Sequence, residues 1–449
     1  MLQKLILQLA LVAVCLTVGA SAQTVTPLDL KQRALANGLK IVSVRDNSSP
    51  TVTVQVWYNV GSKDDPNGKS GFAHLFEHLM FKSTKSMKSE MFDRLTEDVG
   101  GENNASTSDD RTEYHEIIPS NYLETLLWAE AERMRNLNVD EPNFVSERDV
   151  VKEEYRQSVL ANPYGRFFDA IQKRSYTVHP YKRPTIGNID ELNAASLEDV
   201  RAFYQTFYRP DDATLVVVGD FEQTQLDAWI DKYFGRIAKP AGAVPRVTTR
   251  EPARTAEQRF VAIAPNVPLP GVAITYLAPS SKSPDNAALK VAQTILSGGE
   301  SSRLYQELVY KQQIAQETAF INDERTDGGL LIFYAIAAGG KTPENLEKSI
   351  LAELKKMQDA PPSATELEKA KNSLITTALS ERETNLGKGM AIGNAIIYQG
   401  DAAAVNSSIE ELRRVTVKDV QNVMKKYLTG TNRVVIYYQN EAAKEEPQQ

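Results

Sequence analysis

The strongest constraint on the fold is an internal repeat, because the chain reproduces its own hydrophobic pattern at a spacing of 220 residues. Valines alternate along residues 52–56, as in a half-buried strand, and residues 272–276 show a similar alternation. The other pairs at this spacing are Ile189 and Leu192 with Ile409 and Leu412, Asp199 and Val200 with Asp419 and Val420, and residues 215–218 with 435–438. Because 220 residues is about half of the 449-residue chain, the sequence predicts two homologous α/β units and an α+β fold class.

The boundaries of these units follow from local composition. Residues 238–258 have few large apolar side chains and carry Pro240, Gly242, Pro245 and Pro252, which is typical of a linker. The sequence therefore predicts an N-terminal domain at 23–237 and a homologous C-terminal domain at 259–440. The polar residues 441–449 are expected to be a disordered tail.

The first 22 residues have the composition of a signal peptide. Lys4 precedes an apolar run at 5–18, and the small residues 20–22 fit a cleavage site. The run is too short to favour a membrane-spanning helix, so no stable membrane insertion is expected. Cleavage after Ala22 would remove Cys15, the only cysteine, and leave a thiol-free chain suited to an oxidising compartment. The sequence predicts an exported protein, periplasmic or secreted.

Charge and cysteine content exclude two further classes of protein. The chain has 51 Lys and Arg against 58 Asp and Glu, a net charge of −7, which argues against a nucleic-acid partner. A single cysteine excludes a disulfide scaffold.

The segment 71–81 contains a pattern of metal-binding residues. If it is helical, His74 and His78 stand one turn apart on one face, as two imidazoles that share a zinc ion require. Glu77 lies on the same face and can reach a water on the metal without being a ligand. The alternative is two surface histidines beside a helix-face glutamate.

A catalytic zinc site usually has a third protein ligand. In a helix at 146–154, Glu147, Val150, Val151 and Glu154 form one stripe, and the two valines mark it as the buried face. Carboxylates on a buried face need a cation or a full set of hydrogen bonds. Geometry therefore favours Glu154 or Glu147 as the ligand, with the other in support, whereas Glu153 points elsewhere. The alternative is that Glu147 begins a helix and pairs with a Lys or Arg.

Stretches along nearly the whole chain match one known family. They are residues 60–62, 71–84, 100–101, 104–107, 179–181, 208–210 and 217–220. Together they resemble the pitrilysin/insulinase-type inverted zincins (H-x-x-E-H), in their mitochondrial-processing-peptidase-like branch. The resemblance implies a processing-peptidase-like metallohydrolase fold, in which two α/β sandwich domains form a clamshell around peptide segments. It also implies that Glu154, 76 residues beyond His78, is the third zinc ligand and that Glu147 is a supporting carboxylate.

The resemblance also implies roles in peptide hydrolysis. Zinc would activate a water and polarise the scissile carbonyl, and Glu77 would act as the general base. Asn104, Ala105 and Thr107 would lie on an edge strand to which the substrate adds as a further strand. For Asn104 the local sequence equally permits a turn after the glycines at 100–101.

The C-terminal unit departs from the family pattern. Complete relatives carry an Arg and a Tyr seven residues apart that bind substrate, and the matching positions here hold Val309 and Gln316. Arg303 and Tyr310 lie nearby in a different helical phase. The equivalents of His74, Glu77 and His78 at the 220-residue spacing are Thr294, Ser297 and Gly298. The metal ligands are thus expected in the N-terminal unit alone.

These observations predict a zinc-dependent endopeptidase subunit that cleaves peptides or unfolded segments outside the cytoplasm. We expect it to pair with a homologue that supplies the missing Arg and Tyr. The alternatives are a non-catalytic binding or assembly subunit of the same fold and a metal-dependent hydrolase with other chemistry.

Overall fold

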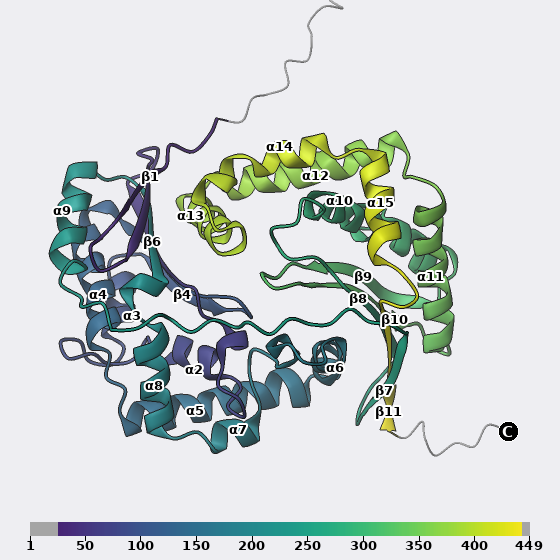
Figure 1. Cartoon of the computed structure of the whole chain (residues 1–449), viewed down its shortest axis with the longest axis horizontal. Helices are drawn as coiled ribbons and strands as arrows, with labels where there is room; N and C mark the ends of the chain where they lie inside the picture. The colour runs from purple at the N-terminus through teal and green to yellow at the C-terminus, as the bar shows by residue number, and fades with distance from the viewer. Residues whose placement is uncertain (1–25, 442–449) are drawn as a thin grey trace, which may run out of the picture.

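The computed structural model describes residues 26–441 (Figure 1). The predicted signal peptide at 1–22 and residues 442–449 of the predicted tail lie outside the described residues. No helix within the described range is both long and apolar enough to cross a membrane.

Two β-sheets form the two halves of the molecule. The first sheet has the strand order β1-β2-β6-β3-β5-β4, and the second has the order β7-β11-β8-β10-β9. The strands of the first are β1 (Lys31–Ala34), β2 (Lys40–Arg45), β3 (Thr51–Tyr58), β4 (Glu102–Thr107), β5 (Thr112–Pro119) and β6 (Ala213–Gly219). Those of the second are β7 (Gln258–Ala264), β8 (Gly271–Leu277), β9 (Ala315–Asp323), β10 (Leu330–Ala337) and β11 (Arg433–Asn440).

The second sheet repeats five strands of the first in order and direction. The pairs β2·β6 and β7·β11 are parallel, and the remaining pairs in each series are antiparallel. Gly219 lies opposite Val52, whereas Tyr437 lies opposite Val272, so the register of β11 is displaced by two residues from the 220-residue spacing. A two-residue displacement keeps every side chain on the same face of its sheet. The predicted α+β fold of two homologous units is confirmed.

Most of the helices cover the outer face of the sheet in their own half (Figure 1). The helices of the first half are α2 (Phe72–Leu79), α3 (Met91–Glu97), α4 (Leu123–Asn136), α5 (Glu141–Tyr155), α6 (Gly165–Ser175), α7 (Ile189–Asn193), α8 (Leu197–Phe207) and α9 (Gln223–Tyr233). Those of the second are α10 (Asn286–Ser297), α11 (Pro343–Asp359), α12 (Ala364–Glu381), α13 (Asn385–Asn394), α14 (Ser408–Arg414) and α15 (Val417–Tyr427). The alternating Val52, Val54 and Val56 are fully buried in the core that β3 forms with helices of the first half.

Capping boxes explain part of the sequence repeat. Ser196 and Asp199 cap the first turn of α8, and Thr416 and Asp419 cap α15 in the same way. The residue after each aspartate, Val200 or Val420, is fully buried.

The two halves exchange a pair of equivalent helices. Helices α6 and α13 are 220 residues apart, and each packs on the sheet of the other half (Figure 1). Phe167 and Ile171 of α6 join a cluster with residues of β8, β10 and β11, and Ile392 of α13 joins Trp57 and residues of β2 and β6. Each half therefore buries apolar side chains from a helix of the other half.

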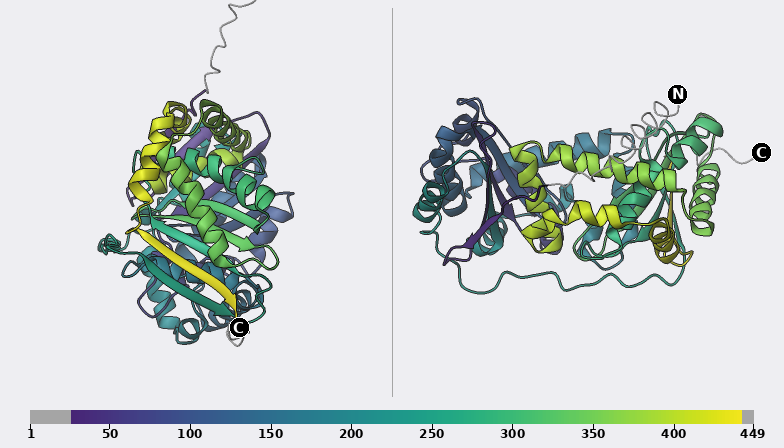
Figure 2. Two further views of the ribbon diagram at one scale, coloured as in Figure 1. Left: turned by 90° about the vertical axis from the view of Figure 1, so that its right-hand side faces the viewer. Right: turned by 90° about the horizontal axis from the view of Figure 1, so that it is seen from above.

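Polar contacts also join the two halves. Lys63 Nζ lies 2.7 Å from Asp110 of the first half and 3.1 Å from Asp327 of the second. Asp110 also accepts a 3.0 Å hydrogen bond from the backbone N–H of Thr326. Residues 238–257, which form neither helix nor strand, run along one side of the molecule between the halves (Figure 2). The domain bounds at 237 and 259 stay a prediction.

Candidate metal centre

The predicted H-x-x-E-H motif lies on α2, and the N-terminus of this helix is fixed by Gly71 and Asp65. Gly71 precedes it with a φ of +93°, and a Cβ there would lie 2.9 Å from the carbonyl oxygen of Ile186, so glycine suits this position. The carboxylate of Asp65 accepts hydrogen bonds from the N–H groups of Gly71 (2.7 Å) and Ala73 (2.9 Å). Asp65 thus caps a helix that has no capping side chain at its own N-cap position.

One face of α2 is buried and the other carries the polar motif. Phe72, Leu75, Phe76 and Leu79 pack into the core of the first half. His74 and His78 lie on the opposite face, and their ring centroids are 4.9 Å apart.

Helix α5 supplies the acidic residues from a stripe that is narrower than predicted. Val151 is fully buried, but Val150 is 46% exposed, so the prediction that both valines mark the buried face was wrong for Val150. The stripe consists of Glu147, Val151 and Glu154, at i, i+4 and i+7. Glu147 is buried, and the side chain of Glu154 is 44% exposed.

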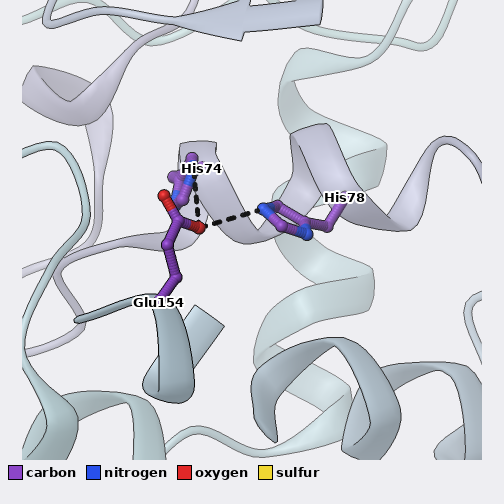
Figure 3. A group of neighbouring side chains, drawn as sticks. All are labelled: His74, His78 and Glu154. Carbon is purple, nitrogen blue, oxygen red and sulfur yellow. Dashed lines mark ion pairs between the residues drawn. The ribbon is translucent and has the colours of Figure 1, made fainter. Parts of the chain in front are cut away.

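The structure brings His74, His78 and Glu154 together (Figure 3). Glu154 Oε2 lies 3.7 Å from His74 Nε2 and 3.5 Å from His78 Nε2. One ligand atom from each of the three residues lies within 4.8 Å of the others, and no further such group of His, Cys, Asp and Glu is found in residues 26–441.

The spacing of these atoms fits a bound zinc ion better than direct hydrogen bonds. Good N–H···O hydrogen bonds are about 2.7–3.2 Å long, shorter than the separations here. Four ligands at about 2.0–2.1 Å from a tetrahedral zinc ion lie about 3.3 Å from one another. Two imidazole nitrogens and one carboxylate oxygen are also the donor types that zinc prefers.

Glu147 lies on the far side of the His78 ring. Its Oε2 atom is 3.6 Å from His78 Nδ1, and its Oε1 atom is 2.8 Å from Lys82 Nζ. Burial alone would raise the pKa of Glu147, but His78 and Lys82 hold it below its ordinary value. The carboxylate is therefore charged and can orient the ring of His78.

The two histidines have opposite pKa shifts in the metal-free chain. Burial, together with the nearby His78, lowers the pKa of His74 to about 4. Burial also opposes a charge on His78, but Glu147 and Glu154 outweigh it and raise the pKa of His78 to about 9. The nearby His78, followed by His74, lowers the pKa of Glu154.

Glu77 lies beside the three-residue group and is not a member of it. Its Oε2 atom accepts a 2.5 Å hydrogen bond from Thr107 Oγ1. Burial raises the pKa of Glu77, and the hydrogen bond from Thr107 opposes that rise.

The predicted substrate strand is β4, at the edge of the first sheet, where it pairs with β5 alone. Asn104 lies within this strand, opposite His115, and not in a turn. The side chain of Ala105 packs against the first core, and that of Thr107 reaches Glu77. Asn104, Ala105 and Thr107 are thus together on an edge strand that α2 contacts.

The positions that match the family's Arg and Tyr hold no equivalent side chains. Val309 packs against the second core, and Gln316 is exposed on β9. Arg303 forms a bidentate pair with Glu366 at 2.6 and 2.9 Å, and Tyr310 is 69% exposed. The counterpart of the metal centre is a cavity of about 60 Å³ whose lining includes Thr294, Gly298 and Lys369.

Two supporting residues, Lys82 and Asp65, and the contact between Thr107 and Glu77 were missed in the sequence. Lys82 had a detectable signal, because it follows His78 by four residues, the spacing that places two side chains on one helical face, although α2 itself ends at Leu79. Asp65 and the contact between Thr107 and Glu77 had none, because each depends on how distant segments pack.

Comparisons with known proteins agree with this geometry. Residues 40–188 match the family described as insulinase (peptidase family M16), and residues 194–374 match the peptidase M16 inactive domain. The zinc protease PqqE of Helicobacter pylori is 32% identical over 425 residues, covering 94% of this chain and 95% of the relative. The probable mitochondrial-processing peptidase subunit beta of Arabidopsis thaliana is 25% identical, covering 88% of this chain and 75% of the relative.

A solved structure shows the same fold over most of the chain. The crystal structure of a protease from Helicobacter pylori superposes with a TM-score of 0.89 and 30% sequence identity, covering 92% of this chain and all of that one. At this coverage the match spans both halves. The chain therefore belongs to the M16 family of peptidases.

Proposed function

We propose that this chain is a zinc-dependent endopeptidase that cleaves peptides or unfolded segments. The observation that carries the proposal is the convergence of His74 and His78 from α2 with Glu154 from α5 on one point. These three side chains would hold the ion, and Glu147 would orient His78. The names of relatives as zinc proteases support this assignment.

The residues beside the ligands have roles that follow from their positions. A zinc ion bound there would polarise the scissile carbonyl and make a water molecule more acidic. Glu77, one residue before His78, would accept the proton of the attacking water on its carboxylate and return it to the leaving amine. Its raised pKa brings it nearer to neutral pH, which favours both steps of this transfer.

Substrate binding is assigned to the free edge of β4. An extended peptide can pair with the backbone of residues 104–107, which makes no further strand contact on that side. Recognition through backbone hydrogen bonds accepts varied sequences but requires an extended segment. This supports peptides and unfolded regions as the substrate class.

A homologous partner subunit completes the proposal. Val309 and Gln316 provide no charge or phenol, and the nearby Arg303 is held by Glu366. An Arg and a Tyr from a second chain would supply the missing contacts to substrate. A relative that is named as a subunit supports such an assembly. We also propose that the chain is exported, with residues 1–22 removed as a signal peptide.

One observation favours a second function, a non-catalytic binding or assembly subunit. Residues 194–374, which include much of the C-terminal half, match the domain described as inactive, and the C-terminal half lacks both substrate-binding residues. The complete set of His74, Glu77, His78 and Glu154 in the first half favours the peptidase.

Zinc content and peptide cleavage test the two functions together. The chain from residue 23 onward is purified with and without a homologous partner, and zinc is counted by elemental analysis. Unstructured fluorogenic peptides serve as substrates. We expect one zinc ion per chain, cleavage that the partner increases, and loss of cleavage with retained zinc in Glu77→Gln. Bound zinc without cleavage in either preparation would favour the non-catalytic subunit, and full activity of the chain alone would contradict the need for a partner.

A further inference from the structure

The hydroxyl of Thr107 makes its shortest hydrogen bond to the carboxylate of Glu77. The 2.5 Å distance from Thr107 Oγ1 to Glu77 Oε2 is typical of a hydroxyl that donates to a charged carboxylate. Thr112 Oγ1 is a second possible acceptor for Thr107 at 3.5 Å, and it donates its own hydrogen to the carbonyl oxygen of Val60 at 3.0 Å. The single hydrogen of Thr107 goes to Glu77, because that contact is much shorter and its acceptor is a carboxylate.

This hydrogen bond joins two elements that belong to different parts of the proposed reaction. Thr107 is the last residue of β4, the strand assigned to the substrate, and Glu77 is on α2 between the two histidines. The side chain of Thr107 lies on the same face of β4 as that of Ala105, which packs toward the core beneath α2. The hydrogen bond from Thr107 thus connects Glu77, the proposed general base, to β4, the proposed substrate strand.

We propose that Thr107 is a positioning residue for Glu77. It holds one carboxylate oxygen in place and leaves the other free to take the proton of the attacking water. Glutamate has three rotatable side-chain bonds, so without this anchor Glu77 would occupy other rotamers part of the time. The inference rests on the proposed function, because it assigns Thr107 a part in the same hydrolysis. It differs from the role predicted for Thr107 from the sequence, which was direct contact with the substrate.

Two substitutions separate the hydrogen bond from the shape of the side chain. Thr107→Val keeps the shape and removes the donor, whereas Thr107→Ser keeps the donor. A matched control is Thr318→Val in β9, the equivalent edge strand of the other half, where the hydroxyl donates to the carbonyl oxygen of Tyr334 at 3.1 Å. All three proteins are loaded with zinc, and kcat and KM are measured on one fluorogenic peptide.

We expect Thr107→Val to lower kcat by about 10- to 100-fold, part of the 10²- to 10⁴-fold that a general base contributes. KM and zinc content should stay near those of the wild type, and Thr107→Ser should keep kcat within about threefold. A Thr107→Val protein with wild-type kcat would overturn the proposal, as would an equal loss in Thr107→Ser. An effect on KM alone would show the substrate contact instead.

A measurement without turnover tests the contact itself. In the metal-free chain, Thr107→Val should lower Tm in the wild-type background and less in a Glu77→Ala background, because the partner is then already absent. Thr318→Val should lower Tm equally in both backgrounds. Equal shifts for Thr107→Val would overturn the contact and the proposal. A wild-type chain that is inactive both alone and with its partner would overturn the proposed function and, with it, the role of Thr107 in turnover.

Discussion

Lys82 and Glu147 form a 2.8 Å ion pair on the side of the metal centre that faces away from Glu154. The second oxygen of this carboxylate lies 3.6 Å from His78 Nδ1, so the pair connects a lysine after α2 to the ring of a proposed ligand. Both side chains are largely buried, and a charged partner keeps Glu147 ionised. Residues that contact a metal-binding histidine without binding the metal fix the orientation of its ring and strengthen metal binding.

Replacing Lys82 should therefore weaken zinc binding. We expect Lys82→Met to lower the affinity by about 10-fold or more, because Glu147 loses the charge that holds it against His78. Competition with a chromophoric chelator measures the change. Lys88→Met, at an exposed lysine on the segment that follows, is the matched control and should bind as the wild type does. Equal affinities in the two variants would exclude a role for the lysine.

Adjacent glutamates on α5 provide a sharp test of the third ligand. Glu154→Gln should lower zinc affinity by more than the roughly 10- to 100-fold expected from loss of an outer partner. Glu153→Gln should leave it unchanged, because Glu153 points to the surface and pairs with Arg156 at 3.1 Å. Zinc content after dialysis against a weak chelator distinguishes the two. Retention of zinc by Glu154→Gln would leave Glu147 as the remaining candidate.

The sequence was sufficient for the features that depend on local periodicity. The spacing of His74 and His78 on a helix is set by the helical repeat, and Glu154 lies seven residues after Glu147 on one face. The 220-residue repeat predicted two sheets of like topology because buried strand residues recur wherever the strands do. Each of these inferences needed only the pattern of residues along the chain.

Other features depend on packing between distant segments, which periodicity does not describe. Val150 and Val151 look alike in sequence, yet only Val151 meets the core, because the stripe that α5 buries is narrower than the pattern allows. The exchange of α6 and α13 between halves leaves no local mark, since each would look amphipathic on either sheet. The contact of Thr107 with Glu77 spans 30 residues and required the placement of β4 beside α2.

The exchanged helix α13 packs tightly against the first sheet at Gly393. A Cβ atom there would lie 1.9 Å from the ring of Trp57, which is itself buried in β3. Gly393→Ala should destabilise the chain by about 1–3 kcal/mol, since either the helix or the ring must move. Thermal unfolding measures the loss as a lower Tm. Gly430→Ala, where a Cβ would meet nothing within 4 Å, should leave Tm nearly unchanged, and equal effects of the two substitutions would contradict this packing.

The ion pair of Asp46 and Lys388 joins the first half to α13 and makes stability depend on acid pH. The hydrogen bond from Lys388 is the main cause that lowers the pKa of Asp46 to about 2 from an ordinary value of 3.8. Because the folded chain holds the proton more weakly than the unfolded chain, the pair stabilises the fold above about pH 4 and loses this effect as the pH falls toward 2. For a partly exposed pair we expect about 1 kcal/mol. Asp46→Asn should therefore lower Tm at pH 7, and the difference from the wild type should shrink steadily between pH 4 and pH 2. Measured Tm values that differ by the same amount at pH 7 and pH 2 would show that the asparagine acts by some means other than the lost charge.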